Sequence, residues 1–325
     1  MSGPQILDAI KAAGIVGLGG AGFPTHVKLA PRNPEQIDYV IANGSECEPY
    51  ITCDDQLMRT RSDGIVEGMR LVLRLFPNAK GVIAIEDNKP EAIAAMAKAC
   101  ASDSNISVLE VKAKYPEGGE RNLIGVVTGR QLRFGQLPAD LGCVVCNVSS
   151  LNAIYRAVCK SEPLMTRLFT VSGDAVVKPH TMEVRIGTSC RELLEAAGGI
   201  KPECTAKKIL CGGPMMGIAM STLDVPIAKN NNALTVLAED EVELAENQMT
   251  ACLRCGRCGH VCPIGLVPQM MAEAAERKDF ERYEKKLYGL DCIACGSCTY
   301  ICPAKRPLMQ LFKQTKASIM AAKRK

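Results

Sequence analysis

The residues most able to do chemistry are eight cysteines in two runs of identical spacing. Residues 252–263 read CLRCGRCGHVCP and residues 292–303 read CIACGSCTYICP. Both fit the Cys-x-x-Cys-x-x-Cys-x-x-x-Cys-Pro spacing of a bacterial-type iron–sulfur site. Four soft, anionic thiolates match the charge and softness of a cubane cluster. The two runs therefore predict two [4Fe–4S] centres.

The fourth cysteine of each run is expected to serve the other centre, as it does in ferredoxins with two clusters. One predicted ligand set is Cys252, Cys255, Cys258 and Cys302, and the other is Cys292, Cys295, Cys298 and Cys262. Pro263 and Pro303 turn the chain away after the last ligand. A pair of zinc sites is the alternative, but zinc requires neither the third cysteine nor the trailing Cys-Pro.

A second chemical feature is the glycine-rich stretch GIVGLGGAGFPTHVK at residues 14–28, with five glycines in its first nine positions. Glycines let backbone N–H groups approach a ligand closely, and the segment that follows can offer a helix N-terminus to a phosphate. The stretch lacks the closing Gly-Lys-Ser/Thr of a Walker loop and does not follow a predicted strand. It is either a ligand loop or a plain tight loop.

Acids and amides follow a predicted strand at residues 37–42, in the sequence NGSECEPY at 43–50. The carboxyl ends of strands are where open α/β sheets bind ligands. A solvated turn is the alternative interpretation. The stretch YPEGGER at 115–121 again places glycine and an acid between a strand and a helix.

These motifs lie among alternating elements. Predicted strands span residues 37–42, 80–86, 106–111 and 143–147, and predicted helices span 2–13, 54–76, 90–100, 123–128 and 148–159. This alternation predicts a parallel sheet with helices on both faces, over an α/β domain at residues 1–161.

A smaller module is predicted at residues 162–228. Strands are expected at 168–172, 175–177, 181–186 and 207–210, with a helix at 189–197 capped by Ser189 and closed by Gly198 and Gly199. This order suggests a β-grasp-like fold. The run CGGPMMG at 211–217 favours close packing over a cofactor site.

Residues 229–325 are expected to form an α-helical ferredoxin-like domain, entered through a linker at 229–250. A helical segment is predicted at 267–287, between the cysteine runs. After Pro303 come seven basic residues and no acid: Lys305, Arg306, Lys313, Lys316, Lys323, Arg324 and Lys325. Leu308, Phe312 and Ile319 could share one helical face. This segment either packs on the cluster domain with a solvated tail or attaches to anionic lipid or an acidic partner.

Composition bounds the class of protein. A length of 325 residues suits two or three domains, and 47% hydrophobic with 23% charged residues is ordinary for a globular chain. A net charge of +4, 4% aromatics and no Trp disfavour a nucleic-acid-binding surface. No apolar stretch approaches the length of a membrane helix, and residues 1–21 do not resemble a signal peptide. The nine cysteines outside the runs form no disulfide framework, so we expect an intracellular, reducing environment.

The glycine loop, NGSECEPY and the paired cysteine runs together resemble the C subunit of the Rnf ion-translocating oxidoreductase, a family similar to the flavin-binding subunit of respiratory complex I. IEDNKPEAI at residues 85–93 strengthens the resemblance, which covers nearly the whole chain. It implies a Rossmann-like flavin fold, a soluble-ligand-binding (SLBB) β-grasp module and a dicluster domain. It also implies bound FMN and reaction with NAD(H).

The resemblance also implies a role for particular residues. Gly17, Gly19, Gly20 and Gly22 would form the loop over FMN and the nucleotide. Phe23 would stack on the nucleotide and Lys28 would bind cofactor phosphate or ring oxygen. Asn43, Glu46, Glu48, Tyr115, Glu120 and Asn147 match further cofactor-site positions of the flavin-binding subunit of complex I. Ser45 and Cys146 depart from that pattern, standing where Asp and a second Asn are found.

The implied function is that of an electron-transfer subunit in a ferredoxin:NAD⁺ oxidoreductase, peripheral on the cytoplasmic side of the membrane. Its implied partners are the other subunits of the membrane complex, NAD(H), and ferredoxin-derived electrons that arrive through a partner. Family members usually carry a further domain before the glycine loop, which here starts about a dozen residues into the chain. Two alternatives are a soluble NADH-dependent reductase, such as a cobalamin reductase, and a non-enzymatic iron–sulfur electron carrier.

Overall fold

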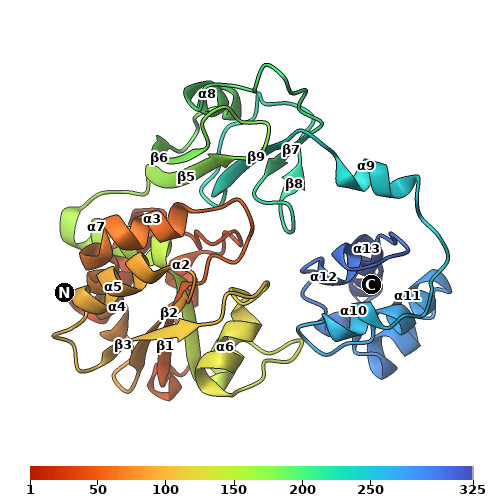
Figure 1. The fold of residues 1–325 in the computed structure, drawn as a ribbon. Helices are drawn as coiled ribbons and strands as arrows, with labels where there is room; N and C mark the ends of the chain where they lie inside the picture. The colour runs from red at the N-terminus through yellow and green to blue at the C-terminus, as the bar shows by residue number, and fades with distance from the viewer. Residues whose placement is uncertain (324–325) are drawn as a thin grey trace. The chain divides into compact units, whose positions relative to one another are not determined.

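The computed structural model describes residues 1–323, except for the side chain of residue 246. The chain divides into two units, which are described separately (Figure 1). The first comprises Met1–Leu132 and Gln136–Ala238, and the second comprises Arg133–Gly135 and Glu239–Lys325. No helix within the described residues is both long enough and apolar enough to cross a membrane.

The first unit begins with a four-stranded parallel sheet in the order β3-β2-β1-β4. The strands are β1 Tyr39–Gly44, β2 Lys80–Glu86, β3 Ile106–Val111 and β4 Cys143–Asn147. The helices around it are α1 Gly3–Ala12, α2 Thr25–Lys28, α3 Cys53–Thr60, α4 Ser62–Leu73, α5 Pro90–Ala99, α6 Glu120–Thr128 and α7 Val148–Lys160, with 3₁₀ turns at Pro34–Gln36 and Pro138–Leu141.

Alternate residues of each strand serve opposite faces of this sheet. Val40 and Ala42 of β1 belong to the core that α1, α3, α4, α5 and α7 cover, whereas Ile41 belongs to the core that α6 covers. Helices therefore lie on both faces, and the predicted parallel α/β fold is confirmed.

The prediction of one helix over 54–76 is wrong, because the chain leaves the helical region at Arg61, with φ −137° and ψ 33°. Its guanidinium binds Glu183 of the following module at 2.6 Å. Two helices, α3 and α4, result, and the first N–H groups of α3 are bound by Glu46, which follows β1.

A five-stranded sheet follows, in the order β6-β5-β9-β7-β8. Its strands are β5 Thr166–Ser172, β6 His180–Arg185, β7 Lys208–Cys211, β8 Ile218–Ala219 and β9 Ala233–Leu237, and its helix is α8 Cys190–Ala196. Ser189 caps α8 as predicted: its side chain accepts from the N–H of Glu192 at 3.2 Å.

Two predictions in this module are wrong. Residues 175–177 form no strand, since Val176 makes only an isolated bridge to Ile200. Residues 233–237, assigned to the linker, form β9, the central strand of the sheet, parallel to β5 and antiparallel to β7. The run ALTVL is apolar, as a buried strand should be, but it lies beyond residue 228, where the module was expected to end.

The second unit contains α9 Glu241–Glu246, α10 Arg257–His260, α11 Pro268–Glu276, a π-helical turn Arg282–Lys286, a 3₁₀ turn Gly289–Asp291, α12 Ser297–Tyr300 and α13 Leu308–Ala322. Leu308, Phe312 and Ile319 of α13 are buried against α11 and Tyr283, as expected for a helix packed on this domain. Several basic residues predicted in the tail have partners within the unit, such as Lys323 with Glu284. Arg324 and Lys325 lie outside the described residues.

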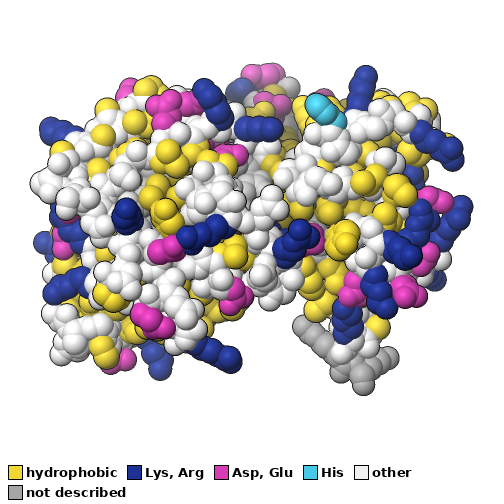
Figure 2. All heavy atoms as spheres, turned by 90° about the horizontal axis from the view of Figure 1, so that it is seen from below, with side chains coloured by type: hydrophobic (Ala, Val, Ile, Leu, Met, Phe, Trp, Pro, Cys, Tyr) yellow, Lys and Arg dark blue, Asp and Glu magenta, His cyan; other side chains and the backbone are white. Residues whose placement is uncertain are grey.

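On the face shown in Figure 2, Lys and Arg side chains are interspersed with Asp and Glu. This arrangement fits the small net charge of +4.

Candidate functional site

The glycine loop lies between α1 and α2 and is closed by its own backbone. The N–H of Gly17 donates to the carbonyl of Phe23 at 2.8 Å, and that of Gly22 donates to the carbonyl of Gly17 at 3.1 Å. Gly20 and Gly22 have φ of +108° and +67°, which side chains rarely adopt. A Cβ at Gly20 would meet no described atom within 4 Å, so a ligand can approach the loop there. Phe23 is 50% exposed beside it.

The polar segment after β1 caps a helix. The Glu46 carboxylate accepts the N–H groups of Asp54 at 2.9 Å and Asp55 at 3.1 Å, at the start of α3. It also accepts from the Cys53 thiol at 3.2 Å. Burial, and then the charge of Asp54, raise the pKa of Glu46 to about 8.

Asp54 ties this segment to the start of α7. Its carboxylate accepts from Ser149 Oγ and from Asn147 Nδ2, both at 2.6 Å. Asn147 also caps α7 by accepting the N–H of Ser149, and it lies against Gly19 of the glycine loop. Burial raises the pKa of Asp54, and the two hydrogen bonds oppose that shift. Asn147 and Glu46 are thus brought together through a residue that the sequence analysis did not select.

Arg167 of β5 lies behind these acids and is only 4% exposed. It donates to the carbonyl of Lys229 at 2.6 Å and to that of Leu18 in the glycine loop at 3.3 Å. Burial lowers the pKa of its guanidinium, and the neighbouring Cys53 and Asp54 oppose the shift. A buried cation therefore partly balances the buried carboxylate of Asp54.

A second group of predicted residues meets where α6 begins. Lys28 donates to Glu120 at 2.9 Å and to the carbonyl of Val145 at 3.0 Å. Asn43 donates to the carbonyl of Gly118 at 2.8 Å and accepts from the N–H of Ser45 at 3.0 Å. The strand ends of the first sheet thus gather the predicted amides, lysine and acids at one edge.

A cavity of about 440 Å³ opens beside this edge. It is lined by residues 46–52, Asp55, Glu86, Asn88, Lys89 and residues 113–115. Glu46, Glu48 and Tyr115, all predicted site residues, belong to its wall. Lys89 pairs with the buried Glu86 at 2.5 Å. The sequence analysis did not select this pair, although both residues lie in the quoted IEDNKPEAI stretch.

In the second unit, Cys252, Cys255, Cys258 and Cys302 line one pocket, the first predicted set. The other four cysteines also lie together: burial, and then the neighbouring thiols of Cys292, Cys295 and Cys262, raise the pKa of Cys298 to about 12. The structure therefore groups the fourth cysteine of each run with the first three of the other.

The two runs share one backbone conformation at an offset of 40 residues. Arg254 and Ala294 have φ of +54° and +55°, and Gly256 and Gly296 have φ of +75° and +82°. The short helices α10 and α12 follow at the same offset, and so do α11 and α13. Two equivalent loops with four sulfurs each fit a pair of cubane clusters better than unrelated metal sites.

Comparison with known proteins assigns a family to each part of the chain. Residues 10–156 match the Nuo51 FMN-binding domain, residues 168–219 the SLBB domain, and residues 245–303 the 4Fe-4S dicluster domain. The structure also resembles a chain of an NAD⁺-reducing [NiFe]-hydrogenase. The TM-score is 0.66 at 24% identity, covering 97% of this chain and 63% of that one, which shows a shared fold.

Several curated relatives match along the sequence. The C subunit of the proton-translocating ferredoxin:NAD(+) oxidoreductase complex of Clostridium ljungdahlii is 44% identical over 99% of this chain and 69% of its own length. The Na(+)-translocating counterpart of Acetobacterium woodii is 42% identical over 98% and 72%. The C subunit of the ion-translocating oxidoreductase complex of Pseudomonas aeruginosa is 44% identical over 82% of this chain and 34% of its own length.

These matches confirm the resemblance drawn from the glycine loop, the NGSECEPY segment and the paired cysteine runs. With an FMN-binding domain, an SLBB domain and a 4Fe–4S dicluster domain in one chain, the protein belongs to the family of C subunits of ion-translocating ferredoxin:NAD⁺ oxidoreductase (Rnf) complexes.

Proposed function

We propose that this chain passes electrons between NAD(H) and the other subunits of an Rnf-type complex, using FMN in the first unit and two [4Fe–4S] clusters in the second. The observation that carries the proposal is the presence, in one chain, of an FMN-binding domain and two four-cysteine groups. A nicotinamide exchanges two electrons as a hydride and a cluster takes one, so a flavin, which can do both, is the converter between them.

Residues of the first unit would hold the flavin at the carboxyl edge of its sheet. Gly17, Gly19, Gly20 and Gly22 would present backbone to it, Lys28 would bind its phosphate or a ring oxygen, and Asn43 and Asn147 would fix its polar edge. The open space at Gly20 and the amides gathered at the strand ends support this assignment.

The nucleotide would occupy the cavity beside that edge, against Glu46, Glu48 and Tyr115. By the family resemblance, Phe23 and Glu120 would also contact it. The size of the cavity and its mixed acidic and basic lining support the assignment. In the second unit the two crossed cysteine sets would hold the clusters. Membrane subunits on the cytoplasmic side would be the partners, and ferredoxin-derived electrons would arrive through one of them to reduce NAD⁺.

Anaerobic reconstitution tests the proposal. Iron, sulfide and flavin are quantified, and NADH is then titrated while the flavin and cluster absorbances are followed. We expect one flavin and about eight irons per chain, with bleaching of both chromophores. Zinc in place of iron, or no flavin under any loading condition, would refute it.

A variant checks the flavin assignment. Lys28→Ala is expected to lower flavin occupancy several-fold, because it removes the cation beside the loop, while about eight irons remain. Loss of iron with flavin retained would show that Lys28 does not serve the flavin.

A further inference from the structure

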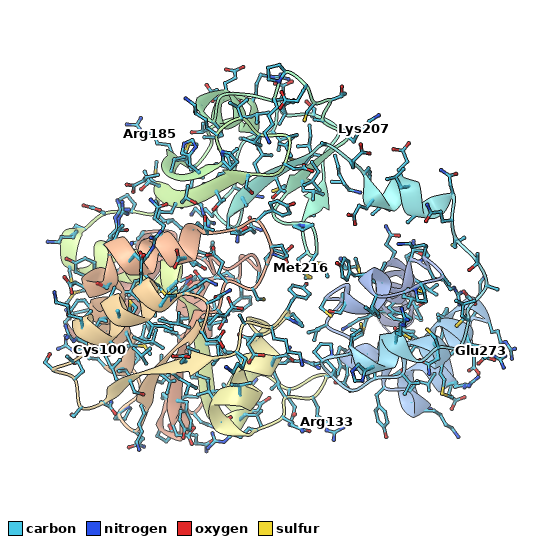
Figure 3. All side chains as sticks on the ribbon, in the orientation of Figure 1. Cys100, Arg133, Arg185, Lys207, Met216 and Glu273 are labelled. Carbon is cyan, nitrogen blue, oxygen red and sulfur yellow. The ribbon has the colours of Figure 1, made fainter. Side chains whose placement is uncertain are left out.

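The loop between β7 and β8 reaches the segment that follows β1. The N–H groups of Met215 and Met216 both donate to Oε1 of Glu48, at 2.7 and 3.0 Å (Figure 3, where Met216 is labelled). Two backbone amides aimed at one oxygen form a small anion-binding nest. The nest belongs to the SLBB module, and the carboxylate belongs to the flavin domain.

Gly213 makes this contact possible. A Cβ added there would lie 2.4 Å from Glu48 Cγ and 2.5 Å from Oε1. Gly212 has φ of +101°, but Gly213 is not among the residues with positive φ, so an alanine at 213 meets no backbone strain of that kind. A side chain at 213 would therefore displace the Glu48 side chain or the loop itself.

The second carboxylate oxygen of Glu48, Oε2, is available to a ligand. Glu48 lines the 440 Å³ cavity, and among the described residues no hydrogen bond reaches Oε2. Burial raises the pKa of Glu48, and the two amides oppose that shift. One oxygen is fixed by the loop, which leaves the other able to accept a hydroxyl or amide donor from a ligand.

The same module also contacts the glycine loop. Lys229 Nζ donates to the carbonyl of Gly14 at 2.6 Å, Asn230 Nδ2 to that of Gly20 at 3.1 Å, and Arg167 to that of Leu18 at 3.3 Å. The module thus contacts the glycine loop and the Glu48 segment together.

We propose that the SLBB module is a positioning element for the nucleotide site, and that its 212–217 loop fixes Glu48 so that one carboxylate oxygen binds the nucleotide. This inference rests on the proposed function, because it takes the cavity beside Glu48 as the site of NAD(H). In this proposal the SLBB module does not bind the nucleotide itself; it fixes the position of a residue of the flavin domain that does.

A double-variant cycle on the reconstituted full chain tests it, with 1,4,5,6-tetrahydro-NAD as a non-reducing probe. Gly213→Ala and Glu48→Ala are each expected to raise the Kd about tenfold, at unchanged flavin and iron content. The double variant should bind no more weakly than Glu48→Ala, because the added methyl group then has nothing to displace. Gly3→Ala on α1, where a Cβ would be 3.4 Å from Leu75, is the matched control.

Binding by Gly213→Ala at the wild-type Kd would overturn the proposal, and so would losses that multiply in the double variant. A measurement without nucleotide separates this failure from that of the proposed function. The ¹³C resonance of the Glu48 carboxyl, assigned with Glu48→Gln, is titrated in oxidised protein. Gly213→Ala should raise the pKa of Glu48, since two donors to the carboxylate are lost.

An unchanged pKa would refute the nest whatever the nucleotide does. A raised pKa in a protein whose wild type fails to bind the probe would instead refute the nucleotide assignment, and the positioning role with it.

Discussion

At the residue scale, the site is organised by buried charge as much as by the residues that its motifs predict. Glu46, Asp54 and Arg167 converge behind the glycine loop, and each is held by backbone or side-chain hydrogen bonds. Removing Arg167 would leave the Asp54 carboxylate buried without its neighbouring cation, which is costly. The cluster therefore fixes the relation between the loop, α3 and α7.

The carboxyl of Glu46 should make stability depend on pH. Its pKa is about 8 in the folded chain against 4.5 ordinarily, so between these values the folded state holds a proton that the unfolded state has lost. Stability should then fall as pH rises through this window. Glu46→Gln should remove that fall and gain on wild type by on the order of 1 kcal/mol between pH 6 and pH 9.

Urea unfolding followed by circular dichroism at several pH values measures this difference. Glu195→Gln, at an exposed position of α8, is the control and should track wild type at every pH. A gap between Glu46→Gln and wild type that does not change with pH would contradict the assigned pKa.

At the element scale, local patterns predicted the first sheet well. Strands β2, β3 and β4 have the predicted bounds. Strands β2 and β4 are buried and read as continuous apolar runs, and the edge strand β3 keeps apolar residues at both ends. The missed features depend on distant partners. The strand β9 has an apolar run, ALTVL, but only its pairing with β5 and β7 places that run in the module's sheet and not in the linker. Likewise, Arg167 interacts with Cys53 and Asp54, which lie more than a hundred positions away in the sequence.

The residues of the candidate site also divide into those that local sequence patterns predict and those that depend on distant contacts. The sequence supplied the glycine loop, the amides and acids at the strand ends, and both cysteine sets. It could not supply Asp54, Arg167 or the loop that holds Glu48, since each acts through a contact between separate elements. The spacing of residues within one segment does not predict contacts between separate segments.

The crossing of α4 and α7 gives a prediction at this scale. A Cβ at Gly68 of α4 would lie 2.0 Å from the carbonyl oxygen of Leu151 on α7, so the two helices approach backbone to backbone. Alanine usually stabilises a helix over glycine by about 1 kcal/mol. Here overpacking should dominate, and Gly68→Ala should lower the free energy of unfolding by about 1–3 kcal/mol.

Gly125→Ala on α6 is the matched comparison, because its Cβ would meet its nearest described neighbour at 3.6 Å. Urea midpoints of the two variants should move in opposite directions. Equal stabilisation by both would show that α4 and α7 are farther apart than the structure places them.

At the scale of the whole molecule, the FMN-binding domain and the dicluster domain lie in different units. The first contains the flavin domain and the SLBB module, and the second contains the repeated cysteine loops. Within the second unit the repeat alone would allow each run to form its own four-cysteine site. The structure instead exchanges the fourth cysteines, which ties the runs into one fold.

This exchange predicts which cysteine pairs can be lost together. Cys252→Ala with Cys302→Ala removes two ligands from one set, so about four irons per chain should remain in the other. Cys252→Ala with Cys262→Ala removes one ligand from each set and should leave few or none. Both variants lose two cysteines and differ only in connectivity, so each controls for the other.

Iron and sulfide analysis after anaerobic reconstitution, with electron paramagnetic resonance of the reduced protein, measures the outcome. Retention of four irons by the second variant and not the first would mean that each run holds its own cluster.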